Sequence, residues 1–383
     1  MTRITADWLD AAATRAVFDA LTGAGHAAYA VGGCVRNTLL HRPVADVDIA
    51  TDARPEQTIA AAQTAGLQAI PTGAAHGTIT LVAGGDPFEV TTFRHDVDTD
   101  GRHAVVAFSD RLEDDAARRD FTMNALYADP DGHVIDPMHG LPDLRAGRLR
   151  FIGDPSQRIA EDYLRILRFF RFHAWYADPD GGIDAEGLAA CAAGQDGLTR
   201  VSAERVGHEI LRLLAADDPA PAVAAMESTG ILARLLPGAD TKGLAPLVML
   251  EDGLPPDPLR RLAALGGEDP TERLRLSRAQ TRRLELLAGA ARDGIGVAEM
   301  SYRHGPQEAR NSALIRSALL ATPLPPTLDE DIARGAGAKF PVAAADLMPG
   351  LTGRALGARL RTLEAAWIAS EFTLTRDALL ALR

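Results

Sequence analysis

The chain has 383 residues, 46% of them hydrophobic, and its 52 acidic residues outnumber its 40 basic residues to give a net charge of −12. This length favours two or three domains with buried cores. No run approaches the roughly 18 apolar residues of a membrane span, and the N-terminal MTRITADWLDAA carries charge where a signal peptide is apolar, so we expect a cytoplasmic protein. Cys34 and Cys191 lie far apart without CxxC spacing, so we predict packing residues and not a disulfide or a cysteine metal site.

The pattern of apolar residues changes at about residue 140. Before it, helical stretches alternate with short strand-like runs, which read AAYAV, DVDIAT, GTITLV, PFEVTTF and NALYAD. After it, strand patterns nearly vanish, and apolar residues recur at helical spacing in segments broken by turns such as ADPDGG, AADDPAPA and DGLPPDP. The sequence therefore predicts an α+β fold, with a mixed head followed by a long helical body.

The stretch YAVGGCVRN near the start of the head predicts a strand over 27–31, a glycine turn at Gly32 and Gly33, and a helix from Val35. Such a turn places free backbone N–H groups where a phosphate can bind, although a plain loop gives the same pattern. The stretch matches neither the GxGxxG of dinucleotide folds nor the GxxxxGK[ST] of P-loops, so both of those sites are disfavoured.

Acidic residues follow in two strand-like runs. In a strand, Asp46 and Asp48 would point to the same face, and Glu89 in the run FEV offers a third carboxylate on that face. Carboxylates gathered on one face suit Mg²⁺, and a pair of divalent ions is the usual clamp for nucleotidyl transfer. An isolated Asp-x-Asp is also common in surface turns.

The total charge argues against a nucleic-acid partner, but the arginines are clustered. Residues 145–172 contain seven arginines against three acidic residues, a local net charge of +4. Residues 273–283 contain five arginines and no acidic residue. Arginine is suited to bidentate phosphate contacts, although a GC-rich genome would also favour arginine over lysine.

Six motifs carry a family resemblance. In chain order they are VGGCVRN with DVDIAT, FEVTTFR, RRDFTMNAL, DPMHGLPDLRAGRLRFIGDP, EDYLRILRFFRF and VSAERVGHEI. The chain resembles the class II CCA-adding tRNA nucleotidyltransferases and the related bacterial poly(A) polymerases. One position departs from the pattern, because many relatives have GGxVRD where this chain has Asn37. An asparagine there keeps a hydrogen-bond acceptor but brings no charge.

The resemblance implies a polymerase-beta-like nucleotidyltransferase head over 1–140, a helical neck with the nucleotide-selecting motif over 141–215, and a body and tail that bind tRNA over 216–383. It assigns Mg²⁺ to Asp46 and Asp48, with Glu89 as a third catalytic carboxylate. Further residues are implied to bind the nucleotide: Gly32, Gly33, Arg36, Arg119, Asp120, Asn124, Glu161, Asp162, Arg165, Arg168 and Arg171. In the body, we expect Arg273, Arg275 and Arg278 to contact RNA phosphates.

The resemblance further implies that Asp162 and Arg165 contact the base of the incoming nucleotide. Cytosine and adenine present an amino donor beside a ring-nitrogen acceptor, which a carboxylate and a guanidinium match, whereas uracil and guanine present the opposite pattern. Without that context, the pattern predicts ordinary pairing of Glu161 and Asp162 with Arg165 on one helix.

We therefore expect an enzyme that adds C, C and A to the 3′ end of tRNA from CTP and ATP, without a nucleic-acid template. A poly(A) polymerase, and an enzyme that adds only CC or only A, share every head motif and remain alternatives. A noncatalytic RNA-binding protein is a more distant alternative, because it would be expected to have lost at least one metal carboxylate. The sequence implies neither a protein partner nor a membrane partner.

Overall fold

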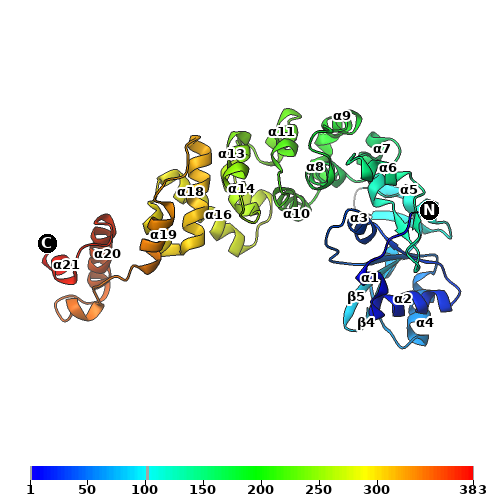
Figure 1. Ribbon diagram of the computed structural model, residues 1–383, viewed down its shortest axis with the longest axis horizontal. Helices are drawn as coiled ribbons and strands as arrows, with labels where there is room; N and C mark the ends of the chain where they lie inside the picture. The colour runs from blue at the N-terminus through cyan, green and yellow to red at the C-terminus, as the bar shows by residue number, and fades with distance from the viewer. Residues whose placement is uncertain (1, 101–102, 383) are drawn as a thin grey trace. The chain divides into compact units, whose positions relative to one another are not determined.

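The structure is a computed structural model that describes residues 2–100 and 103–382 (Figure 1). The chain divides into two compact units, residues 1–231 and residues 232–383. Within the described residues, no helix combines the length and apolar character needed to cross a bilayer. The boundaries at residues 140 and 215 stay predictions.

The head of the first unit is built on a mixed sheet of seven strands in the order β3-β4-β5-β2-β1-β8-β9. Its strands are β1 (Ala28–Val31), β2 (Asp48–Thr51), β3 (Gln68–Gly73), β4 (Thr78–Ala83), β5 (Asp86–Thr92), β8 (Tyr127–Ala128) and β9 (Val134–Ile135). Strand β2 is antiparallel to β1 and parallel to β5, which places Asp48 at the start of β2 beside Glu89 in the middle of β5. Strands β6 (Arg94–Asp100) and β7 (His103–Phe108) form a separate antiparallel pair.

The five strand-like runs of the sequence all form strands, and the predicted α+β class is confirmed. Alternation is clearest in β4, where Ile79 and Leu81 are fully buried and Thr78 and Thr80, which alternate with them, are partly exposed. The strands β3, β6, β7 and β9 were not predicted. One predicted strand is shorter than expected, because β2 begins at Asp48 and Asp46 lies in the loop before it.

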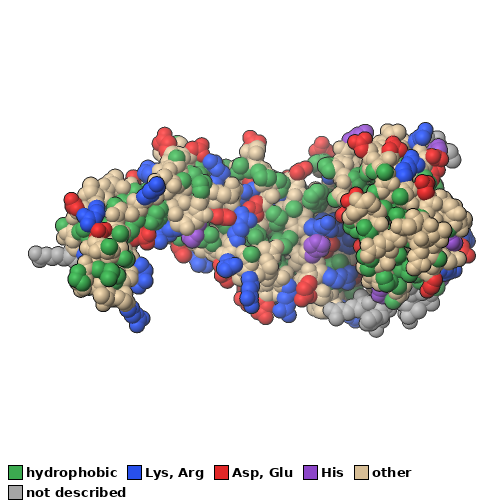
Figure 2. Space-filling view, turned by 90° about the horizontal axis from the view of Figure 1, so that it is seen from below, with side chains coloured by type: hydrophobic (Ala, Val, Ile, Leu, Met, Phe, Trp, Pro, Cys, Tyr) green, Lys and Arg blue, Asp and Glu red, His purple; other side chains and the backbone are tan. Residues whose placement is uncertain are grey.

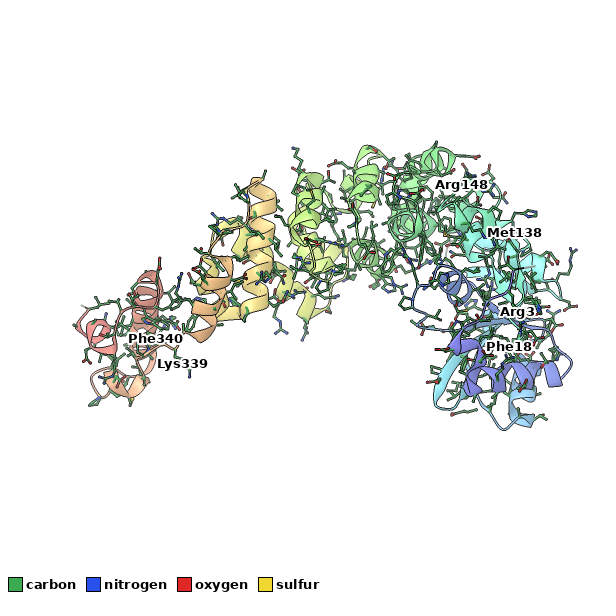
Figure 3. All side chains as sticks on the ribbon, viewed as in Figure 1. Arg3, Phe18, Met138, Arg148, Lys339 and Phe340 are labelled. Carbon is green, nitrogen blue, oxygen red and sulfur yellow. The ribbon has the colours of Figure 1, made fainter. Side chains whose placement is uncertain are left out.

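Helices α2 (Ala12–Gly23) and α4 (Pro55–Thr64) lie side by side and pack on the sheet beside β4 (Figure 1). The apolar stripe of α2 includes Phe18, which is fully buried and is labelled in Figure 3. Cys34 and Cys191 are both buried free thiols, as expected for packing residues.

The rest of the first unit is helical. Its remaining helices are α1 (Asp7–Asp10), α3 (Gly33–Leu39), α5 (Leu112–Ala117), α6 (Gly140–Arg145), α7 (Pro155–Glu161), α8 (Leu164–Tyr176), α9 (Ala185–Gly194), α10 (Ala203–Leu214) and α11 (Ala220–Ser228). Phe121 of the head lies 5.2 Å from Phe172 of α8 and 4.9 Å from Phe151, measured between ring centroids. Phe151 stacks on Phe169 at 5.5 Å. This aromatic cluster fixes α8 against the head, and α10 packs along α8.

The second unit, residues 232–383, is helical in the part that the structure describes. Its helices are α12 (Ile231–Leu235, which starts at the boundary), α13 (Leu244–Leu250), α14 (Pro258–Leu265), α15 (Pro270–Arg273), α16 (Arg278–Asp293), α17 (Val297–His304), α18 (Pro306–Leu320), α19 (Leu328–Gly337), α20 (Gly353–Ala369) and α21 (Arg376–Ala381). Glu251 is buried and accepts hydrogen bonds from Arg260 and Arg261, which are also buried. Near the C-terminus, Phe340, labelled in Figure 3, packs against Trp367 in a small aromatic core.

Candidate active site

A cavity of about 380 Å³ opens in the first unit beside the glycine turn. It is lined by the turn between β1 and α3, the loop before β2, the segment 119–124, and the helices α8 and α10. Ten of the predicted site residues line it together: Gly32, Gly33, Arg36, Asp46, Asp48, Arg119, Asp120, Asn124, Arg168 and Arg171. The lining also includes six residues to which the sequence analysis gave no role in the site: Asn37, Val44, Ala45, Phe172, Tyr176 and Arg212.

The glycine turn has the local structure that its sequence predicts. Gly32 has a φ of 72°, in the region that favours glycine, and an added Cβ would lie 3.4 Å from the Arg119 guanidinium. Helix α3 begins at the next residue, Gly33. The turn therefore brings the backbone at the start of α3 to the cavity wall, close to Arg119.

The acidic residues lie where β2 and β5 run side by side. Asp48 and Glu89 are partners in the parallel register of these strands, and Asp46 lines the same cavity from the preceding loop. The alternation argument for Asp46 was therefore wrong, since Asp46 precedes the strand, but Asp46 and Asp48 both face the cavity. Burial raises the pKa of Asp48, and the charges of Glu89 and Asp46 raise it further, while Arg119 opposes them.

Asp46 and Asp48 can offer ligands to a divalent cation from the cavity wall, and Glu89 is the strand neighbour of Asp48, although the three carboxylates do not all lie within 4.8 Å of one another. Their side chains offer carboxylate oxygens, the ligands that Mg²⁺ and Ca²⁺ prefer. The mutual repulsion that raises the pKa of Asp48 is the repulsion that a bound cation relieves. Acidic side chains gathered in this way indicate a site for a divalent metal.

A second acidic group lies elsewhere in the head. Asp129, Asp131 and His133, at the turn between β8 and β9, have ligand atoms within 4.8 Å of one another. Asp129 already accepts hydrogen bonds from the backbone N–H groups of Asp131 and His133 and contacts the His133 ring at 3.0 Å. These contacts account for the group as an ordinary turn.

Arg36 is a buried cation held by neutral groups. Its guanidinium donates to the side-chain oxygens of Asn124 at 2.5 Å and Asn37 at 3.0 Å, and to the Tyr176 hydroxyl at 2.8 Å. The guanidinium also lies 4.1 Å from the Tyr176 ring centroid. Burial lowers the pKa of Arg36 below its usual value.

Asp120 connects the head to α8. One oxygen of its carboxylate accepts from Arg168 Nε at 2.7 Å, and the other accepts from Asn124 Nδ2 at 2.8 Å and from the Phe121 N–H at 2.9 Å. Burial would raise the pKa of Asp120, but Arg168 and the hydrogen bonds outweigh it and lower the pKa to about 2. A continuous chain of side chains therefore runs from Arg168 through Asp120 and Asn124 to Arg36.

Asp115 supports the neighbouring arginines, although the sequence analysis did not identify it. It is buried and accepts from Arg118 at 2.6 Å, Arg119 at 3.0 Å and the Tyr127 hydroxyl at 2.7 Å. Burial opposes ionisation, yet Arg119 and Arg118 hold the pKa of Asp115 below its usual value. The spacing of Asp115 from Arg118 and Arg119 is a local signal that pointed to this contact.

Helix α10 contributes a second support for α8. Glu209 is buried and accepts from Arg171 at 2.6 Å, and it lies 3.9 Å from Arg168. Glu209 falls in the motif VSAERVGHEI, but the sequence analysis gave it no role. Arg212, one turn further along α10, is exposed at the edge of the cavity.

Four predicted site residues are not in the cavity lining: Glu89, Glu161, Asp162 and Arg165. Helix α7 ends at Glu161 and α8 begins at Leu164, because Asp162 has extended backbone angles. The single helix predicted through EDYLR was therefore wrong. Arg165 still pairs with Glu161 at 2.5 Å, whereas Asp162 pairs with Arg205 of α10 at 2.7 Å.

Comparison with known proteins identifies the family. Residues 28–150 match the family described as "Poly A polymerase head domain", and residues 182–242 match "Probable RNA and SrmB- binding site of polymerase A". The CCA tRNA nucleotidyltransferase 1, mitochondrial, of Danio rerio is 33% identical over 368 residues, which cover 91% of this chain and 85% of that protein. The chain belongs to the tRNA nucleotidyltransferase and poly(A) polymerase family. The family predicted from the ordered motifs is thus confirmed.

Other members of the family agree. The CCA-adding enzyme of Streptococcus pyogenes serotype M5 (strain Manfredo) is 43% identical over 205 residues, which cover 53% of this chain and 49% of that protein. The crystal structure of the Bacillus stearothermophilus CCA-adding enzyme in complex with CTP matches with a TM-score of 0.71 and 27% identity, covering 93% of this chain and 92% of that one. The Thermotoga maritima CCA-adding enzyme complexed with tRNA has the same fold, with a TM-score of 0.68 and 17% identity over 95% and 92% of the two chains.

The low pKa of Asp120 leads to a test of the link between head and α8. A depressed carboxyl pKa contributes stability above the pKa of the unfolded chain, near 3.8, and that contribution is lost as the pH falls towards about 2. We expect Asp120→Asn to lower the free energy of unfolding at pH 7 by about 2 kcal/mol, with a difference from wild type that shrinks below pH 4.

The measurement is urea unfolding, followed by circular dichroism at pH 3, 4 and 7. Asp19→Asn, an exposed position on α2, is the control and should match wild type at each pH. If the free energy of unfolding of Asp120→Asn were lower than that of wild type by the same amount at every pH, the charge of the carboxylate would not be the source of the stability.

Proposed function

We propose that this protein adds C, C and A to the 3′ end of tRNA from CTP and ATP, releasing pyrophosphate and using no nucleic-acid template. The observation that carries the proposal is the pairing, in one cavity, of the acidic group around Asp48 with the arginines of α3 and α8. An acidic group suits the metal-bound reacting centre, and arginines suit the phosphates of the nucleotide. The names of several relatives describe this activity for those proteins.

The acidic and basic residues of the site would have different roles in nucleotidyl transfer. Asp46 and Asp48 would hold the metal, with Glu89 beside them as a third carboxylate. Mg²⁺ is the ion that we propose, because the ligands are carboxylate oxygens, and when bound it favours the ionised 3′ hydroxyl of the RNA and neutralises the departing pyrophosphate. Gly33 and Arg36, which line the same cavity, would bind the triphosphate of the nucleotide.

The other cavity residues hold the nucleotide in place for the reaction. Gly32 would let the backbone approach the phosphates closely, and Arg119, Asp120 and Asn124 would contact the ribose and phosphate region. Arg168 and Arg171 would add positive charge along α8. The 3′ oxygen of the RNA then bonds to the α-phosphorus, and the bond to the β-phosphate oxygen breaks to release pyrophosphate.

Base selection belongs to Asp162 and Arg165 in this proposal, with Glu161 as the ion-pair partner of Arg165. Both side chains contact protein groups in the structure, Asp162 with Arg205 and Arg165 with Glu161. Asp162 is 30% exposed and Arg205 is 42% exposed, so their ion pair is worth little and opens readily to a base. A carboxylate acceptor beside a guanidinium donor then accepts C and A and mispairs with U and G.

RNA binding by the second unit rests on exposed arginines. Arg273 ends α15, Arg278 begins α16, and Arg275 lies between the two helices, and all three are exposed. Arg283, further along α16, is different because it is held by Asp257 at 2.5 Å and by Glu308 at 2.7 Å. Figure 2 shows basic side chains in groups on the helical part of the chain, with acidic side chains among them.

Poly(A) addition, and addition of CC or A alone, are separated from CCA addition by one assay. Purified protein is incubated with Mg²⁺, one labelled nucleotide at a time, and tRNA ending at the discriminator base, and product length is read on a gel. Two C additions followed by one A addition support the proposal, whereas a long A tract would overturn it.

A cytoplasmic location stays a prediction, since relatives include proteins named as mitochondrial.

The first functional prediction concerns the metal ligands. Asp46→Ala or Asp48→Ala should abolish both C and A addition while the fold is kept, because each change removes a ligand and relieves repulsion between carboxylates. Incorporation of each nucleotide is measured at several Mg²⁺ concentrations. The control is Asp131→Ala, in the other acidic group, which should leave both activities unchanged. Near-normal turnover of either site variant would show that this pair does not hold the metal.

The second prediction concerns base selection. Asp162→Asn presents a donor where an acceptor stood, so the ratio of kcat/KM for CTP and ATP over UTP and GTP should fall by tenfold or more, about 1.4 kcal/mol. Arg165→Ala should reduce the rates with CTP and ATP further. Arg205→Ala removes the ion-pair partner of Asp162 and should leave the ratio unchanged. If Arg205→Ala and Asp162→Asn gave the same ratio, the ion pair and not the base contact would be responsible.

The third prediction concerns RNA. Replacing Arg273, Arg275 and Arg278 together with alanine should weaken tRNA binding. The slope of the logarithm of the binding constant against the logarithm of the salt concentration should become shallower by roughly 0.7 to 0.9 for each phosphate that is no longer bound. The affinity for CTP should stay the same. Arg292→Ala neutralises an exposed arginine near the other end of α16 and serves as the control. A triple variant that binds tRNA like wild type at low and high salt would remove these residues from the interface.

A further inference from the structure

Asn37 lies between the cation Arg36 and the loop that carries Asp46. Its side-chain oxygen accepts from Arg36 Nε at 3.2 Å and from Arg36 Nη2 at 3.0 Å. Its side-chain nitrogen donates to the carbonyl oxygen of Pro43 at 2.9 Å. An amide can accept on one side and donate on the other, whereas an ionised carboxylate can only accept.

The side-chain oxygen of Asn37 accepts from Arg36 but carries no negative charge, so it does not offset the charge of Arg36. Arg119 pairs with Asp115, Arg168 with Asp120, and Arg171 with Glu209. Arg36, by contrast, is held by Asn37, Asn124 and the Tyr176 hydroxyl, all of which are neutral. Arg36 is only 6% exposed, so its charge acts in a poorly screened site.

The hydrogen bond donated by the Asn37 side chain anchors the loop from residue 40 to residue 47. This loop contributes Val44, Ala45 and Asp46 to the cavity. Two further contacts hold its start: the Arg42 N–H donates to the Asn37 carbonyl at 2.8 Å, and the Arg42 side chain donates to the Trp175 carbonyl of α8 at 2.6 Å. The bond to Pro43 is therefore the side-chain tether nearest to Asp46 along the loop.

We propose that Asn37 is a positioning residue that leaves the charge of Arg36 available to the nucleotide's triphosphate and holds the loop that carries Asp46. This inference rests on the proposed function of Arg36. A carboxylate at position 37 would offset the positive charge of Arg36 and would face the Pro43 carbonyl with a second acceptor. The single change Asn37→Asp, which replaces an NH₂ group with an oxygen, therefore disturbs both roles at once.

The test compares binding of CTP and CMP to the full-length protein by calorimetry, in the presence of Mg²⁺ and without RNA. Asn37→Asp should weaken CTP binding by about tenfold, because the added charge opposes the triphosphate, and should change CMP binding by less than about twofold. Raising the salt concentration should reduce the difference in CTP affinity between Asn37→Asp and the wild type. Gln63→Glu makes the same amide-to-acid change on the exposed face of α4 and should leave both affinities unchanged.

A second variant separates the two roles. Asn37→Ala removes both hydrogen bonds without adding charge, so it should keep CTP affinity within about threefold of wild type while lowering kcat for both nucleotides, because the loop with Asp46 is less well held. Equal weakening of CTP and CMP by Asn37→Asp, or unchanged CTP binding, would overturn the proposal. Wild-type protein that bound neither CTP nor ATP would instead overturn the proposed function, and this inference with it.

Discussion

The carboxylate of Asp120 is the interaction on which the rest of the site depends. It binds Arg168 of α8 through one oxygen and Asn124 of the head through the other, so it fixes two parts of the chain that are 44 residues apart. Asn124 can then present its oxygen to Arg36, because its nitrogen is already engaged. The low pKa of Asp120 shows how strongly this arrangement favours the charged form. The aromatic cluster around Phe121 adds apolar packing at the same junction.

Charge in the cavity is arranged in two groups, and this explains how an acidic protein can bind nucleotides. The carboxylates of Asp48 and its neighbours repel one another, and that repulsion favours a bound cation. Most of the arginines in the cavity lining are paired with buried acids such as Asp115 and Glu209, which fix their positions and offset their charge. Local arrangement, and not the net charge of −12, therefore decides what the cavity attracts.

The sequence predicted the parts of the site that depend on local pattern. The glycine turn, the acidic strand β2 and most strands of the head follow from short-range periodicity, and the order of the motifs identified the family. Contacts between distant segments could not be predicted in this way. Arg36 meets Tyr176 across 140 residues, and no spacing rule connects them. The break after Glu161 was missed because the apolar pattern continues through it, although the backbone of Asp162 is extended.

The departure at Asn37 shows why a family pattern and a structure answer different questions. From the pattern alone, an asparagine in place of an aspartate is the loss of one charge at the start of a helix. In the structure, the residue lies within α3, and its amide contacts a cation on one side and a carbonyl on the other. Because Arg36 finds its other partners in Asn124 and Tyr176, a neutral residue at 37 leaves a buried positive charge without a carboxylate partner. Such a charge is costly unless an anion offsets it, and the triphosphate of a nucleotide is the anion that the proposed reaction supplies.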